Sequence, residues 1–180
     1  MSDGSLLWLF LLQLFFVFLN ALFACAEIAV ITMNDNKLAK LTAAGDKRAV
    51  RLTKVTEQPS SFLATIQVGI TLVNLLASAV ATQNFSDRLE AWIESLGLGI
   101  PASVLNVISV VVITILLTYV TVLLGELVPK RLAMQNAEKI ALRMSGLIYA
   151  MYRLFTPAVW LFTVSTNGLL RLLGVNPMKE

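Results

Sequence analysis

Residues 6–33 read LLWLFLLQLFFVFLNALFACAEIAVITM, and Glu27 is the only charged residue in this stretch. A helix of about 20 predominantly apolar residues spans the hydrocarbon core of a bilayer, so the stretch is long enough to cross it. The whole chain is similarly apolar. Of its 180 residues 57% are hydrophobic and 14% are charged, whereas soluble domains carry about 25% charged residues. The composition predicts an all-α integral membrane protein and excludes a soluble globule, a disordered chain and a nucleic-acid-binding module.

Two later stretches, 62–82 and 102–124, predict a second and a third transmembrane helix after the first at 6–33. The segment 84–99 between them is polar, which indicates a loop. Residues 125–131 read GELVPKR and combine glycine and proline with charge. We expect the third span to end there, because glycine and proline interrupt a helical pattern.

The segment 34–60 differs from the spans because it carries six basic residues: Lys37, Lys40, Lys47, Arg48, Arg51 and Lys54. Asp35 or Asn36 can cap a first short helix, Gly45 can end it, and Asp46 can cap a second. We therefore expect a cytoplasmic helical hairpin that lies against lipid headgroups.

The last apolar stretch, 144–175, is long enough to span a membrane but contains Arg153 and Pro157. An arginine near the centre of a bilayer is costly, whereas Tyr152 and Trp160 suit the membrane interface. We expect a bent juxtamembrane belt helix here, with a fourth span as the alternative.

The orientation follows from the basic residues, of which six lie in 34–60, four in 125–143 and one in 83–100. Segments rich in lysine and arginine remain on the cytoplasmic side. The N-terminus is then outside, and the C-terminus is cytoplasmic if 144–175 does not span. We expect a multi-pass protein of the cell membrane, either the inner or the plasma membrane.

Polar residues at membrane depth recur at helical spacing. The second span carries Gln67, Thr71, Asn74, Ser78 and Thr82 on one face. The first span has Gln13, Asn20 and Glu27 at steps of seven, and the third has Thr114, Thr118 and Thr121, with Glu126 near its end.

Two interpretations of these stripes remain open. Hydroxyl and amide side chains commonly join helices in membranes, and Glu27 and Glu126 could reach the cytoplasm from the inner ends of their spans. Three polar faces and two carboxylates at one level favour an ion path. Oxygen ligands suit Mg²⁺, Ca²⁺ or Na⁺, and the chain has no histidine to bind zinc or copper. Gly69 would let backbone approach the path closely.

Three motifs carry a family resemblance: NALFACAEIA at 20–29, TIQVGITLVN at 65–74 and GELVPK at 125–130. In this order they resemble the membrane domain of the cyclin-M/CorC family, also called hemolysin-like proteins, over nearly the whole chain. The resemblance implies one membrane domain at 1–180, with three transmembrane helices, a cytoplasmic helix pair and a juxtamembrane belt.

The resemblance also implies Mg²⁺ export by a homodimer, coupled to Na⁺, with a dehydrated Mg²⁺ among polar residues of the three spans. The ligand positions that it carries over are Asn74, Ser78 and Glu126. The supporting positions are Glu27, Gly69, Thr71 and Gly125.

The chain departs from the family at three positions. Ala24 and Ala26 stand where members commonly have serine, and Ile70 stands where many have asparagine. Three oxygen ligands are therefore missing. Members usually continue into cytoplasmic CBS domains, and because this chain stops at Glu180 we expect a truncated protein that lacks them.

We expect a secondary transporter that exports a divalent cation, driven by Na⁺ or by the membrane potential, and not an enzyme. The chain has no Walker-type phosphate loop, so nothing in it could hydrolyse ATP. Two alternatives remain. One is a non-transporting membrane scaffold or regulator, in which the stripes only join helices. The other is an exporter of small organic cations such as polyamines, in which the carboxylates bind an ammonium group.

Overall fold

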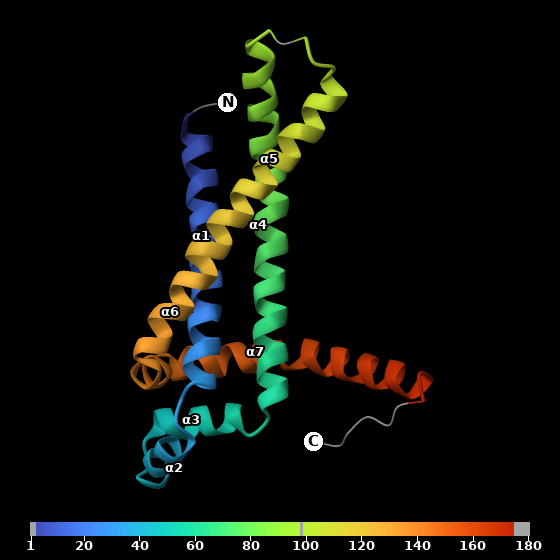
Figure 1. The fold of residues 1–180 in the computed structure, drawn as a ribbon. Helices are drawn as coiled ribbons and strands as arrows, with labels where there is room; N and C mark the ends of the chain where they lie inside the picture. Colours follow the sequence, from blue (N-terminus) through green and yellow to red (C-terminus); the bar gives the residue numbers. More distant parts are fainter. Residues whose placement is uncertain (1–2, 98, 175–180) are drawn as a thin grey trace. The chain divides into compact units, whose positions relative to one another are not determined.

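The computed structural model describes residues 3–97 and 99–174, and in these residues all regular secondary structure is helical (Figure 1). The elements are α1 (Asp3–Ile31), α2 (Asp35–Ala43), α3 (Lys47–Thr56), α4 (Pro59–Ser95), α5 (Ala102–Val122), the π-helical turn η1 (Leu123–Leu127), α6 (Val128–Gln135) and α7 (Ala137–Leu172). Within the described residues, four stretches are long and apolar enough to cross a membrane: Leu6–Ile31, Pro59–Ser95, Ala102–Gln135 and Ala137–Leu172. The all-α membrane prediction is confirmed, while the count of three spans stays a prediction.

The chain divides into two compact units. Unit 1 comprises Met1–Ala24 and Thr71–Pro129, and unit 2 comprises Cys25–Ile70 and Lys130–Glu180. Helices α1 and α4 each contribute one segment to both units.

The core of unit 2 forms where α3 packs against α7. Ala49, Leu52 and Val55 recur every third residue on α3 and are buried, and Ala141 and Ile148 are buried on α7. Residues three and four apart share one face of a helix, so each helix offers a continuous apolar stripe to the other. This stripe holds the basic hairpin on α7.

The hairpin ends confirm most of the predicted turn chemistry. Asn34 caps α2, because its side-chain oxygen accepts a hydrogen bond from the backbone N–H of Lys37. The prediction that Asp35 or Asn36 forms this cap was therefore wrong, because the cap lies one residue before Asp35. Gly45 follows α2 with a φ of +81°, a conformation that glycine adopts without strain. Asp46 caps α3 as predicted.

Helix α4 is longer than the predicted span at 62–82, because the segment expected to be a loop from 84 is helical up to Ser95. Packing within unit 1 explains the extension. The ring of Phe85 lies 5.3 Å from that of Phe10 on α1, and Ser86 is buried. The side chain of Asn106 on α5 also donates a hydrogen bond to Glu90. Residues 85, 86 and 90 of this polar segment thus make contacts within unit 1 that keep it helical.

The helix of the third span was also expected to break within residues 125–131, and this was wrong because it continues into α6. Where the membrane span itself ends stays a prediction. The backbone N–H of Val128 donates to the carbonyl of Leu123, five residues earlier. In a regular α-helix the ring of Pro129 would meet the carbonyl of Gly125. The wider π-helical turn accommodates the proline without ending the helix.

The predicted belt at 144–175 corresponds to α7, which begins earlier, at Ala137, and continues through Pro157 to Leu172. The last residue of the predicted belt lies outside the described residues. Within unit 2, α7 runs across the 59–70 part of α4 rather than along it (Figure 1).

Candidate ion-binding site

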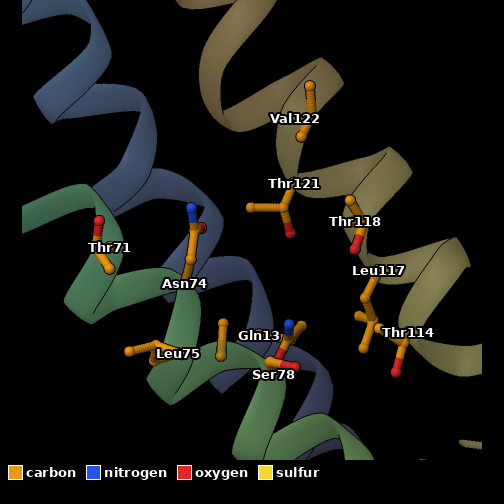
Figure 2. Close-up of a pocket in the computed structure, with 11 residues that line it drawn as sticks. Gln13, Thr71, Asn74, Leu75, Ser78, Thr114, Leu117, Thr118, Thr121 and Val122 are labelled. Carbon is orange, nitrogen blue, oxygen red and sulfur yellow. The ribbon is translucent and has the colours of Figure 1, made fainter. Parts of the chain in front are cut away.

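A pocket of about 320 Å³ opens inside unit 1 (Figure 2). Its polar lining comes from α1, α4 and α5 and consists of Gln13, Thr71, Asn74, Ser78, Thr114, Thr118 and Thr121. Its apolar lining consists of Leu75, Ala77, Leu117 and Val122. Polar residues from all three predicted spans therefore meet in one cavity.

Helical spacing explains this convergence. Thr71, Asn74 and Ser78 are three and four residues apart, so they lie on one face of α4. On α5, Thr114, Thr118 and Thr121 follow the same spacing, and Figure 2 shows the three threonines on one side of that helix. The sequence identified both stripes, and the structure places them around the same pocket.

Two amide side chains in the pocket carry buried polar atoms that have no hydrogen-bond partner among the described residues. Gln13 is 8% exposed, and neither its Oε1 nor its Nε2 has a partner. The Oδ1 of Asn74 is also buried without one. Most buried polar atoms in folded proteins are hydrogen-bonded, so unpartnered atoms that face a cavity indicate a site for a polar ligand or water.

All polar groups that line the pocket are neutral amides and hydroxyls. Within the described ranges, no three Asp, Glu, Cys or His side chains gather closely enough to hold a metal ion. A cation in this pocket would therefore be contacted by neutral oxygens.

Glu126 does not line the pocket. It lies on η1 and is partly buried. The adjacent Gly125 is buried against α1, where a methyl group added to it would lie 3.2 Å from Cβ of Asn20 and 3.3 Å from the carbonyl oxygen of Val17. Gly125 thus lets η1 approach α1 closely, and Asn20 is 1% exposed with its Oδ1 unpartnered among the described side chains.

Two supporting positions belong to unit 2. Gly69 lies in the 59–70 part of α4. Glu27 forms an ion pair with Lys130, with 3.0 Å between Oε2 and Nζ. Glu27 thus already has a cationic partner from the chain itself.

The structure therefore brings Asn74, Ser78 and Thr71 together and sets Glu126 and Gly125 on a π-helical turn in the same unit. The set of predicted site residues omitted Gln13 and the three threonines of α5. The signal was present, because all four had been recognised on polar stripes, but stripe membership alone does not separate ligands from contacts between helices.

Comparison with known proteins adds independent evidence. The family model for the cyclin M transmembrane N-terminal domain matches residues 11–180. The chain belongs to the cyclin M transmembrane domain family. This confirms the resemblance to CorC and hemolysin-like proteins, a family commonly linked to Mg²⁺ transport and not known as an enzyme family.

Three relatives are identical to this chain at about a third of the aligned residues. It is 33% identical to UPF0053 protein sll0260 of Synechocystis sp., covering 91% of this chain and 37% of that protein. It is 32% identical to UPF0053 protein YhdT of Bacillus subtilis, covering 90% and 35%. It is 32% identical to the uncharacterized protein Rv1841c of Mycobacterium tuberculosis, covering 94% and 48%. The chain thus spans between a third and a half of the length of these relatives.

Proposed function

We propose that this cyclin M domain exports Mg²⁺ by secondary transport coupled to Na⁺, as a homodimer in the cell membrane. The observation that carries the proposal is the pocket of unit 1, where the unpartnered Oδ1 of Asn74 lies beside Ser78 and a threonine stripe. Family membership supports the choice of Mg²⁺ over other hard cations.

In this proposal each predicted ligand has a separate role. Asn74 and Ser78 supply neutral oxygens, and Glu126 supplies the negative charge that a divalent ion needs. Glu126 occupies a π-helical turn, and such turns occur frequently at functional sites. A change in this turn would shift the Glu126 carboxylate relative to α5 and thereby couple ion binding to helix movement.

The proposed topology has three spans, formed by α1, α4 and α5 to α6, with the N-terminus outside. Helix α7 would lie at the cytoplasmic surface as a belt. Its crosswise course over the 59–70 part of α4 supports this role (Figure 1). Trp160 and Leu161 are exposed on α7, as expected for side chains that face lipid. Cytoplasmic CBS domains of a full-length protein are the proposed regulatory partners.

A second candidate function is export of small organic cations. The pocket volume of about 320 Å³ favours it, because pockets that bind small molecules begin at about 300 Å³. The neutral lining argues against it, since an ammonium group would find no carboxylate among the lining residues.

Flux in proteoliposomes tests the proposal. The protein should move Mg²⁺ in response to a Na⁺ gradient, and Asn74→Ala should slow this flux. Asn106→Ala is a matched control, because Asn106 lies on α5 and contacts Glu90 rather than the pocket. Flux of putrescine without flux of Mg²⁺ would favour the organic-cation function. Flux of neither would favour a scaffold.

A further inference from the structure

Basic side chains are concentrated in unit 2. Its described residues, 25–70 and 130–174, include twelve lysines and arginines and five Asp and Glu residues. The described residues of unit 1 include one arginine and five acidic residues. The preference of basic residues for the cytoplasmic side accounts for this imbalance in number. It sets no requirement on where the side chains lie within the unit.

Three of these basic residues form a stripe on α3. Lys47, Arg51 and Lys54 follow one another at steps of four and three, so they share one face of the helix. All three are exposed, whereas the buried apolar residues of α3 lie on another face. The α3 stripe is therefore outside the core of unit 2 and is available to a partner.

A second stripe runs along α7 at the same spacing. Its members are all exposed and follow one another at steps of four, three, four and three: Lys139, Arg143, Gly146, Ala150 and Arg153. Beyond this stripe the same face continues with the exposed apolar side chains of Leu154, Leu161 and Val164. One face of α7 is thus basic in its first half and apolar in its second.

The two stripes meet at Gly146. A methyl group added to Gly146 would lie 3.4 Å from Nη1 of Arg51, so the guanidinium group from α3 lies over α7 at a position without a side chain. Arg143 is one turn earlier on the same face of α7, and residues three apart on a helix have their Cβ atoms about 5–6 Å apart. The contact of α3 with α7 therefore brings together two arginines that are far apart in the sequence.

No acidic side chain among the described residues forms an ion pair with either stripe. The ion pairs of unit 2 lie elsewhere and use three of its five acidic residues: Lys37–Glu138, Arg48–Asp46 and Glu27–Lys130. Like charges that gather without a counter-charge repel one another. An anion bound beside Arg51 and Arg143 would relieve this repulsion.

An anionic phospholipid matches both halves of this surface. A guanidinium group binds phosphate through paired N–H donors, and basic residues next to a membrane are attracted to anionic lipids. The exposed side chains of Leu154 and Leu161 suit the boundary between headgroups and acyl chains. A free phosphate ion or an acidic protein segment would leave these apolar side chains without a partner.

We propose that Arg51 and Arg143 bind the phosphate group of an anionic phospholipid where α3 contacts α7. The acyl chains of this lipid lie along the apolar half of the same face of α7. The sequence predicted contact between the basic hairpin and headgroups, and the structure adds α7 as the second part of a defined site. The inference does not depend on which cation is transported.

The heat stability of the purified chain in an uncharged detergent tests the proposal. Phosphatidylglycerol should protect the chain. Phosphatidylcholine with the same acyl chains should protect it much less, because its choline group balances the charge of its phosphate. Inorganic phosphate and poly-glutamate are the anions without acyl chains, and neither should protect.

The double variant Arg51→Gln, Arg143→Gln removes both phosphate donors. The concentration of phosphatidylglycerol that gives half of the full protection should rise about tenfold or more. Both side chains are exposed, so folding should remain intact. The matched control is Arg88→Gln, Arg171→Gln, which removes the same charge from α4 in unit 1 and from the last turn of α7. It should leave this concentration unchanged.

Gly146→Glu tests the same place by adding a charge. Its carboxylate would lie beside the guanidinium group of Arg51 and replace the phosphate. The added carbon meets only the flexible end of Arg51, so stability without lipid should be retained while protection by phosphatidylglycerol falls. Gly168→Glu is the control, because it adds the same charge to α7 where no atom lies near the added carbon.

Loss of protection by phosphatidylglycerol in the Arg51, Arg143 double variant and in Gly146→Glu, but not in their controls, would support the site. Equal protection by phosphatidylcholine, or equal losses in the variants and their controls, would overturn the inference. Protection by inorganic phosphate would indicate a site for a free anion, and protection by poly-glutamate would indicate a site for an acidic protein segment. Either result would overturn the assignment to a lipid.

Discussion

The carboxylate of Glu27 and the ammonium group of Lys130 lie 3.0 Å apart, and both side chains are about three-quarters buried. The pair joins two of the family motifs, since Glu27 lies in NALFACAEIA and Lys130 ends GELVPK. Each residue supplies the opposite charge that the other needs at a partly buried position. This favours a structural role for Glu27 over its predicted supporting role at the ion site.

Replacing Glu27 by Gln should lower the free energy of unfolding by about 1–3 kcal/mol, because it leaves the partly buried charge of Lys130 without its partner. The double variant Glu27→Gln, Lys130→Met should recover most of this loss, since it removes both charges. Chemical denaturation in detergent measures both effects. Losses that simply add in the double variant would contradict the assignment.

Hydrophobic length and turn residues were sufficient to predict most of the fold. The long apolar helices, the basic hairpin and the cap at Asp46 followed from local pattern. The two errors in α4 and at Pro129 have a common origin. In both places a polar or helix-breaking sequence stays helical because of contacts that local pattern does not contain, namely the ring of Phe10 against Phe85 and the π-helical turn η1.

Close approach at Gly125 should make this position intolerant of a side chain. The β-carbon of Gly125→Ala would lie 3.2 Å from Cβ of Asn20 and 3.3 Å from the carbonyl oxygen of Val17. Neither atom can rotate away, so α1 and η1 must separate, at a cost of about 1–3 kcal/mol in unfolding free energy. The same denaturation experiment measures this loss.

Gly168→Ala is the matched control, because Gly168 lies within α7 with no atom near the added carbon. Alanine is the better helix former, so this variant should gain up to about 1 kcal/mol. Equal changes in unfolding free energy for the two variants would show that close approach of α1 does not require glycine at position 125.

Stability of the hairpin should fall in acid through Asp46. Hydrogen bonds from the Arg48 side chain, and then from its backbone N–H, hold the pKa of Asp46 below its ordinary value. Because this pKa is lowered in the folded state, the ionised carboxylate stabilises α3 at any pH above the pKa of an unfolded Asp, about 3.9. The stabilisation is lost as the pH falls through the lower pKa of the folded state. The protection of α3 amides against exchange, taken relative to the intrinsic exchange rate at each pH, should therefore fall below about pH 4.

Asn at position 46 keeps the helix cap but cannot titrate. In Asp46→Asn, the protection of α3 amides against exchange should therefore show no step near pH 4. If the step persists in the variant, another group is responsible for the acid sensitivity of the hairpin.

The candidate site was harder to predict than the fold. Periodicity placed Asn74 and Ser78 on one face of α4, and the structure has both at the pocket. Periodicity cannot give the rotation of one helix about its axis relative to another, so it could not show that Gln13 would be buried in the same pocket while Glu126 would not line it.

Glu126 provides the most direct test of the proposed ion site. Glu126→Gln keeps the shape of the side chain but removes a negative charge from the partly buried turn η1. A unit charge acting on a divalent ion at low effective dielectric contributes several kcal/mol, so Mg²⁺ binding should weaken at least tenfold, or about 1.4 kcal/mol. Asn74→Ala should weaken it less, because it removes only a neutral oxygen.

Glu94→Gln, at the exposed end of α4, is the control and should bind Mg²⁺ normally. Protection by Mg²⁺ against heat in detergent measures each affinity. If Mg²⁺ protects the wild type and protects Glu126→Gln and Asn74→Ala equally well, the ion binds elsewhere and both ligand assignments are wrong.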